Sequence, residues 1–360
     1  MPALQKLLDQ AAVDIDSGRL PSCQLAVAQH GELVELASFG TATESSRYVV
    51  FSVTKALTAA LAWQVIGEDV LSDQTRVAEL IPEFDTEGKR DVTLEHLLTH
   101  TAGFPNAPIR SLDGATEQGR AKRFAQWRLD WPAGSRTHYH SVAAHWVVAD
   151  LVEKATGTDY RLALQERVLG PLGLTRLQLG GTTGEVQELT MVGGATSELP
   201  VAVAVDQTAL NFNDPANQAV GVPGAGAVAG AADIALFYQA LLHNPGRLWR
   251  PDVLADATSR VRFDHLDPFT HVPANRTLGL TVAGDDGKAM MREFGKACSP
   301  RAFGASGLGG QIAWADPATG VSFCYLTNGL DTDLVASYLR SSRLSTLAAR
   351  WGNAREATGS

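Results

Sequence analysis

The chain contains 360 residues, 45% of them hydrophobic, and carries a formal net charge of -9 at pH 7. It is long enough to bury one large core, and its acidic balance excludes the basic surface that binding to nucleic acid or an anionic membrane requires. No apolar run reaches the roughly 18 residues of a transmembrane helix, and the N-terminus lacks the apolar core of a secretory signal. These features predict a cytoplasmic protein, or a mature form whose signal has been removed.

The predicted elements begin with an amphipathic helix over residues 1–10 and a β-hairpin over residues 25–38, which turns at His30-Gly31. Helices are then predicted near residues 93–100, 120–128, 141–156, 160–168 and 231–243, followed by a second hairpin over residues 311–328 and a closing helix over residues 333–350. The stretch from residue 180 to 230 has few helix signals and is left unassigned.

Strands near both ends of the chain, with helices between them, predict an α+β protein. We expect both chain ends to build one antiparallel sheet that is flanked by helices, with a mostly helical lobe inserted. The whole chain, residues 1–360, is treated as a single domain. Its α/β part is expected at roughly 1–75 and 230–350, and the inserted lobe at roughly 76–229.

The most informative motif is Ser52, which is followed three residues later by Lys55 at the start of an apolar stretch. Residues three apart share one face of an α-helix, so the hydroxyl and the amine are expected to meet at the first helical turn. Burial among Ala and Leu lowers the pKa of a lysine, which allows it to act as a base. The pair predicts a serine nucleophile, although a Ser-x-x-Lys match also arises by chance and the hypothesis depends on further motifs.

Five segments provide these further motifs, and they occur in this order: Ser52-Val-Thr-Lys55, Leu97-Leu-Thr-His-Thr-Ala-Gly-Phe104, Tyr139-His-Ser141, Gly221-Val-Pro-Gly-Ala-Gly226 and Phe303-Gly-Ala-Ser-Gly-Leu-Gly-Gly310. Over about residues 20–345 the chain resembles the serine β-lactamase and penicillin-binding-protein superfamily. It is most similar to the class C-like branch, which includes the lipolytic family VIII carboxylesterases. The resemblance implies the β-lactamase-like fold and a mechanism that needs no cofactor.

The resemblance also implies a role for each matching residue. Ser52 is expected to be the acylated nucleophile, Lys55 its base or proton relay, and Tyr139 a phenol that titrates with the lysine as a coupled pair. The backbone N–H groups of Ser52 and Leu308 are expected to form the oxyanion hole. Contacts with the substrate are expected from Ser141, Ala305, Ser306, Gly307 and Phe104.

Two positions depart from the family pattern. Ala305 takes the place of the Lys or His that opens the third motif, and Ser141 stands where the tyrosine motif commonly ends in Asn. In the family the cation helps to bind a substrate carboxylate, so we expect a neutral, less polar site that suits esters better than peptides or β-lactams. Four aromatic residues either line this site or belong to the core: Phe104, Trp127, Trp131 and Phe303.

Metal binding is not predicted. His96 and His100 are four residues apart on a predicted helix, but Leu97 replaces the glutamate of the zinc-protease motif. The three cysteines, Cys23, Cys298 and Cys324, lack a metal-binding spacing and are interpreted as reduced thiols.

Two other patterns have weaker interpretations. Residues 304–308 nearly match a nucleophile elbow, but no histidine follows Ser306 to act as its base. His138 and His140 flank Tyr139, where they either tune its proton transfer or remain solvated bystanders.

The sequence thus predicts a serine hydrolase that cleaves a small-molecule carboxylic ester through an acyl-Ser52 intermediate. Three alternatives remain: acyl transfer to an alcohol or amine, hydrolysis of an amide or β-lactam, and an inactive binding protein on the same fold. The joint presence of Ser52, Lys55 and Tyr139 argues against the inactive protein.

Overall fold

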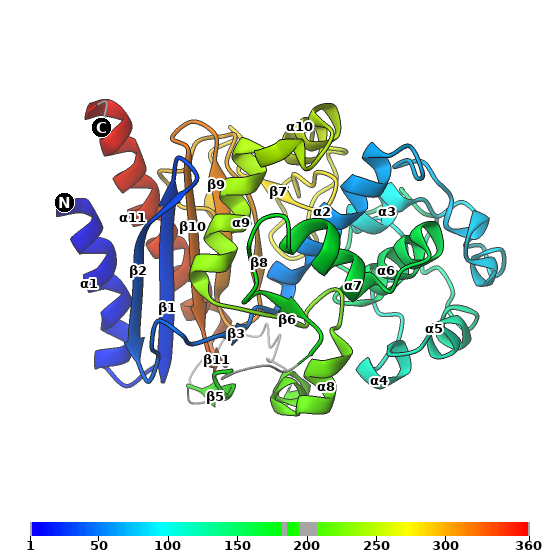
Figure 1. The fold of residues 1–360 in the computed structure, drawn as a ribbon, viewed down its shortest axis with the longest axis horizontal. Helices are drawn as coiled ribbons and strands as arrows, with labels where there is room; N and C mark the ends of the chain where they lie inside the picture. Colours follow the sequence, from blue (N-terminus) through cyan, green and yellow to red (C-terminus); the bar gives the residue numbers. More distant parts are fainter. Residues whose placement is uncertain (1, 182–185, 194–206, 359–360) are drawn as a thin grey trace.

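A computed structural model describes residues 2–181, 186–193 and 207–358 of the chain. Its main sheet has six antiparallel strands in the order β2-β1-β10-β9-β8-β7 (Figure 1). The strands are β1 (Ser22–Gln29), β2 (Glu32–Gly40), β7 (Thr281–Val282), β8 (Phe303–Gly307), β9 (Gln311–Asp316) and β10 (Val321–Thr327). The predicted α+β fold, with one antiparallel sheet built from both chain ends, is therefore confirmed.

Helices cover both faces of this sheet (Figure 1). The flanking helices are α1 (Pro2–Asp16), α9 (Ala231–His243) and α11 (Leu334–Thr358). Along β1, Leu25 and Val27 enter the core beneath α1 and α11, whereas Ala26 and Ala28 enter the core shared with α9. Successive side chains of a strand point to opposite faces, so a strand covered on both faces is apolar along its whole length.

The remaining helices gather mainly on the other side of the molecule, at the right of Figure 1. They are α2 (Thr54–Gly67), α3 (Leu94–Leu98), α4 (Ser111–Gly114), α5 (Glu117–Phe124), α6 (Ala143–Thr156), α7 (Tyr160–Leu164), α8 (Pro215–Val220) and α10 (Pro251–Ser259). Helix α2 is buried nearly all round, as expected from its continuous apolar sequence. The division into a single domain with an inserted lobe stays a prediction.

Part of the stretch that was left unassigned forms short strands. Strand β6 (Ala227–Ala229) lies between β3 (Tyr48–Val49) and β4 (Gln178–Leu179), and β5 (Thr190–Val192) pairs in parallel with β11 (Gly329–Asp331). Strands this short carry too few residues to show a period in the sequence. Residues 182–185 and 194–206 of the same stretch lie outside the described residues.

Several predicted helix boundaries differ from the structure. The helix predicted over residues 120–128 is α5, which begins earlier because the Thr116 side chain caps it by accepting a hydrogen bond from the Gly119 N–H. It also ends earlier, at Phe124, and the chain then turns so that Trp127 packs against Phe84, Phe104 and Phe124. The closing helix extends beyond the predicted end, to Thr358.

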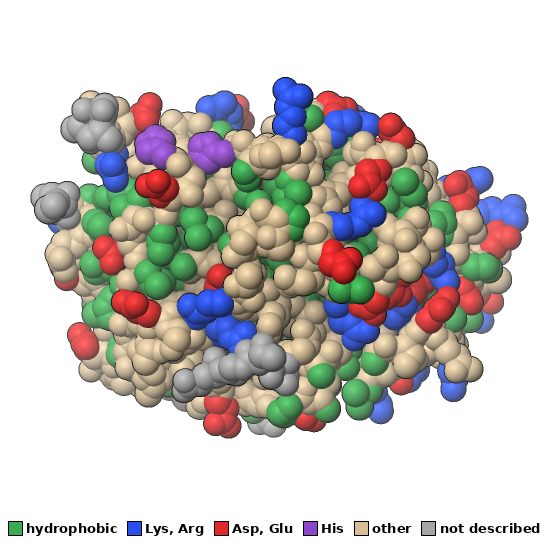
Figure 2. Space-filling view, viewed as in Figure 1, with side chains coloured by type: hydrophobic (Ala, Val, Ile, Leu, Met, Phe, Trp, Pro, Cys, Tyr) green, Lys and Arg blue, Asp and Glu red, His purple; other side chains and the backbone are tan. Residues whose placement is uncertain are grey.

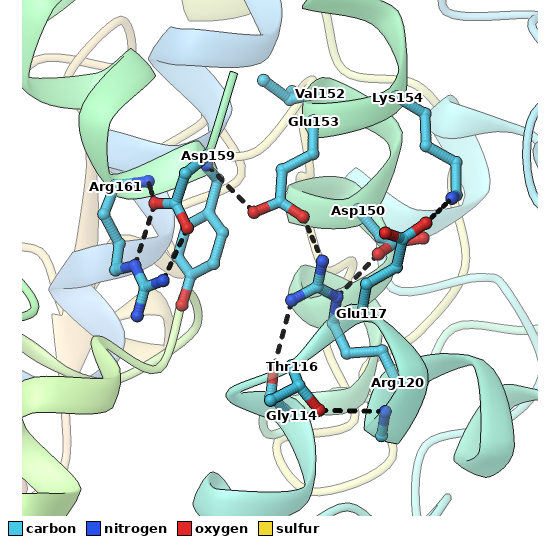
Figure 3. Close-up of polar contacts among 12 residues, drawn as sticks. Gly114, Thr116, Glu117, Arg120, Asp150, Val152, Glu153, Lys154, Asp159 and Arg161 are labelled. Carbon is cyan, nitrogen blue, oxygen red and sulfur yellow. Dashed lines mark hydrogen bonds and ion pairs between the residues drawn. The ribbon is translucent and has the colours of Figure 1, made fainter. Parts of the chain in front are cut away.

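A buried ion-pair network joins α5 and α6 (Figure 3). Arg120 of α5 is 2% exposed and donates a hydrogen bond of 2.6 Å to Asp150 of α6, and it also pairs with Glu153. Removing one member of such a buried pair typically costs about 3–5 kcal/mol, because the other charge is left unpaired. The network therefore holds α6, the helix that follows the tyrosine motif, against α5.

The surface drawn in Figure 2 carries acidic and basic side chains side by side over the helical lobe, at the right of the view. Among the described residues, no helix is both long and apolar enough to cross a bilayer.

Candidate active site

Ser52 lies in a single 3-10 turn, η1 (Phe51–Val53), that leads directly into α2. Phe51, the residue before it, has a φ of 43°, a left-handed conformation that is uncommon for an aromatic residue. The Phe51 ring packs edge-on against Phe212, with centroids 5.7 Å apart. Backbone conformations of this kind persist where the surrounding structure enforces them, and they cluster at functional sites. The turn places Ser52 at the N-terminal end of α2, as the sequence predicted.

The Lys55 side chain is 4% exposed, and its amine contacts three oxygen atoms. Nζ lies 2.9 Å from Ser52 Oγ, 2.7 Å from the carbonyl oxygen of Ser141 and 2.8 Å from that of Gly224. A neutral amine has two N–H donors and one lone pair. The two carbonyls can accept both N–H groups, and the lone pair is then left to accept the Ser52 proton.

The pKa of Lys55 lies below its ordinary value of 10.5, chiefly because burial penalises the charged form. Interaction with Tyr139 opposes this shift, whereas the positive charge of Arg276 adds to it. The shift is toward the neutral amine, the form that a proton acceptor needs.

Tyr139 lies over the same amine: Lys55 Nζ is 4.8 Å from the centroid of the phenol ring. The Tyr139 ring also packs against His100, with ring centroids 4.6 Å apart. The imidazole of His100 is buried, and its Nδ1 accepts the N–H of His140. Ser52, Lys55 and Tyr139, predicted to act together, are therefore brought together by the fold.

Strand β8 approaches the nucleophile at Gly307. A β-carbon at this position would lie 2.6 Å from the carbonyl oxygen of Val50 and 3.2 Å from the backbone nitrogen of Ser52. Only glycine permits so close an approach. The next residue, Leu308, packs against the apolar cluster that contains Phe51, so the two chain segments predicted to form the oxyanion hole are neighbours.

The predicted substrate-binding residues differ in their accessibility. Ser141 is exposed and Ala305 and Ser306 are half-buried, so these three are within reach of a ligand. Phe104 is 1% exposed, and its ring stacks on Trp127 with centroids 5.3 Å apart. The Phe104 ring therefore belongs to the core. For the four aromatic residues near the site, this was the alternative to lining the substrate pocket.

His96 and His100, the two histidines considered as metal ligands, do not lie on one helix. Helix α3 ends at Leu98, before His100, and His96 Nδ1 accepts the N–H of Thr93. His140 is likewise engaged, because its Nε2 accepts the N–H of Phe104. Within the described ranges, no group of three or more His, Cys, Asp or Glu side chains is arranged to hold a metal ion.

Sequence reasoning missed Arg276, a half-buried arginine at the site. Its guanidinium carbon is 5.6 Å from the Tyr139 ring centroid. The expectation of a neutral, less polar site was based on Ala305 and did not take this arginine into account. No motif surrounds Arg276 in the sequence. It bridges Thr281 of β7, which pairs with β8, and its guanidinium lies beside the Tyr139 ring.

A serine hydrolase that works through an acyl-enzyme is the class of protein that this fold and this cluster of serine, lysine and tyrosine define. The family model described as Beta-lactamase matches residues 4–347, so the chain belongs to the Beta-lactamase family.

Three relatives illustrate this membership. The chain is 27% identical over 318 residues to "Esterase/beta-lactamase LipL" of Mycobacterium tuberculosis, covering 80% of this chain and 70% of the relative. It is 26% identical over 367 residues to "Esterase EstB" of Burkholderia gladioli, covering 90% and 89%. The crystal structure of a family VIII carboxylesterase superimposes with a TM-score of 0.80 at 24% identity, covering 97% of this chain and 98% of that one, which shows a shared fold.

Proposed function

We propose that this protein hydrolyses carboxylic esters through an acyl-Ser52 intermediate. The observation that carries the proposal is the 2.9 Å contact between Ser52 Oγ and the buried amine of Lys55, whose pKa is lowered by burial. Two relatives described as esterases, which cover 80% and 90% of this chain, support the same reaction.

In the first half of the reaction, Lys55 and Tyr139 together accept the Ser52 proton as Oγ attacks the ester carbonyl. The tetrahedral oxyanion would be stabilised by the backbone N–H groups of Ser52 and Leu308. Collapse of this intermediate breaks the bond to the alkoxy oxygen. The alcohol leaves with the proton held by the relay, and the acyl group stays on Ser52.

In the second half, water takes the place of the alcohol. The same relay accepts a proton from the water, whose oxygen attacks the acyl carbonyl. The bond to Ser52 Oγ then breaks, the proton returns to the serine, and the carboxylic acid is released. If an alcohol or amine replaces water in this step, the product is a new ester or amide, which is the acyl-transfer alternative.

The substrate is proposed to lie against Ser141, Ala305, Ser306 and Gly307, with Phe104 supporting the site from the core. The half-buried backbone of β8 at residues 305–307 and its closeness to Ser52 support this placement. Reaction without a metal or other cofactor and a cytoplasmic location remain predictions of the sequence.

The test is covalent labelling of the nucleophile. The protein is treated with a p-nitrophenyl alkylphosphonate, and intact mass and peptide mapping identify the modified residue. We expect one adduct, at Ser52, together with loss of p-nitrophenyl butyrate hydrolysis. Ser52→Ala should take up no label and lose on the order of a thousandfold or more in rate. Near wild-type turnover by Ser52→Ala would refute the proposal.

A further inference from the structure

Two basic side chains lie close to the Tyr139 ring. Lys55 Nζ is 4.8 Å from the ring centroid, and the guanidinium carbon of Arg276 is 5.6 Å from it. Lys55 is buried and already contacts the nucleophile and two carbonyls. Arg276 is half-buried and has no part in the proton relay proposed above. Its presence therefore needs a separate explanation.

A short hairpin fixes the position of Arg276 beside the third motif. Arg276 forms an antiparallel bridge with Thr281 of β7, and its side chain donates a hydrogen bond of 2.7 Å to Thr281 Oγ1. Thr281 pairs with Gly304 of β8, the residue immediately before Ala305. The guanidinium is thus anchored on the strand next to the one in which the family places its substrate-binding cation.

Among the described residues, Arg276 lacks the ion-paired carboxylate partner that most well-buried arginines of this protein have. Four arginine side chains that are at most 6% exposed each form an ion pair with a carboxylate: Arg120, Arg262, Arg292 and Arg340. Within the part of the chain that the structure describes, Arg276 forms no ion pair with a carboxylate. A guanidinium has five N–H donors, and Thr281 accepts a bond from one of them.

Glu293 is an acidic group that interacts with Arg276. Removal from water raises the pKa of this carboxyl, while a hydrogen bond with Ser306 and the charge of Arg276 oppose the rise. Arg276 brings its positive charge to within 5.6 Å of the Tyr139 ring centroid, beside the paired strands β7 and β8.

We propose that Arg276 binds a carboxylate of the substrate, so that Ser52 acts preferentially on esters that carry a carboxylate near the scissile carbonyl. A planar guanidinium can donate two parallel hydrogen bonds to one carboxylate, which gives both affinity and orientation. The inference rests on the ester hydrolysis proposed above and specifies its substrate class. In this protein, Arg276 takes the role that the residue at position 305 cannot fill.

The experiment compares charged and neutral esters of matched size. One pair places the carboxylate on the acyl group: p-nitrophenyl hemiglutarate against p-nitrophenyl pentanoate. The other pair places it on the alcohol portion: 3-carboxyphenyl acetate against phenyl acetate. The measured quantity is the ratio of kcat/KM for the charged ester to that for the neutral one. A ratio is used because loss of Arg276 also changes the electric field at Tyr139, which affects both esters.

In at least one pair, Arg276→Gln is expected to lower the ratio by about 10- to 100-fold, mainly through KM, as a lost hydrogen bond between charged groups implies. Arg276→Lys should restore part of it, because lysine keeps the charge but not the fork geometry. Arg301→Gln is the matched control. It removes the same charge from an exposed position just before β8 and should leave the ratio unchanged.

An unchanged ratio in Arg276→Gln for both pairs would overturn this inference, whether neither ester loses activity or both lose it equally. Either result, with neutral esters still hydrolysed in a manner that requires Ser52, would leave the proposed ester hydrolysis standing. Failure of the wild type to hydrolyse any of the four esters would instead refute the proposed function itself.

Discussion

Gly307→Ala provides a direct test of how β8 and the nucleophile turn fit together. The added β-carbon would lie 2.6 Å from the Val50 carbonyl oxygen, and an ordinary contact begins at 3.4 Å. The strand and the turn must therefore separate by about 0.8 Å. Because the β-carbon would also be 3.2 Å from the Ser52 nitrogen, this separation occurs where the oxyanion hole is proposed.

The size of the effect follows from that displacement. A misplacement of about 1 Å in a catalytic site can cost about 100-fold in rate, so we expect kcat/KM for p-nitrophenyl butyrate to fall by roughly 10- to 100-fold. Inserting a methyl group into a well-packed region also typically costs about 1–3 kcal/mol of stability. Activity should be normalised to the folded fraction, which urea denaturation followed by circular dichroism measures.

Gly320→Ala is the matched control for this substitution. Gly320 lies in the turn between β9 and β10, at the opposite end of β9 from the site, and a β-carbon there would meet no atom within 4 Å. Its φ of 66° makes alanine strained, so stability should fall by roughly 1 kcal/mol without loss of kcat/KM per folded molecule. Wild-type kcat/KM in folded Gly307→Ala would refute the proposed placement of β8.

Two further predictions concern the proton relay. Lys55→Ala and Tyr139→Phe should each cause a large loss of kcat/KM, and the double variant should lose far less than the product of the two losses, because residues that act as one unit are not additive; independent losses would make Tyr139 a packing residue. The pH dependence of kcat/KM should rise with pH as Lys55 loses its proton. Since burial lowers the pKa of Lys55 in the folded protein, the midpoint should lie below the ordinary 10.5, and a midpoint at or above that value would contradict a neutral Lys55 base.

Much of the fold could be predicted because its signals are local. The alternation and turn residues of the second hairpin placed β9 and β10 within a residue of their observed ends. The apolar sequence of α2 predicted a helix buried on all sides, as it is. The short strands between residues 178 and 229 could not be predicted in the same way, because their pairing partners lie far away in the chain.

The site, like the fold, has a part with local sequence signals and a part that depends on distant segments. Ser52 and Lys55 are three residues apart, so helical geometry alone placed the hydroxyl beside the amine, and the contact is 2.9 Å. The matching motifs then linked Tyr139 to the pair by resemblance, which the 4.8 Å separation from the Lys55 amine agrees with.

The sequence by itself determined the α+β fold class and the closeness of Ser52 to Lys55, because the fold class follows from the periods and order of the elements and the closeness from helical spacing. Only the tertiary structure decided the charge of the site. Ala305 leaves β8 without the basic residue of the family motif, but Arg276, which bridges Thr281 of β7, lies beside Tyr139. A charge acts through space over several ångströms. The electrostatics of a site therefore depend on all the segments that surround it, and a motif within one segment cannot predict them.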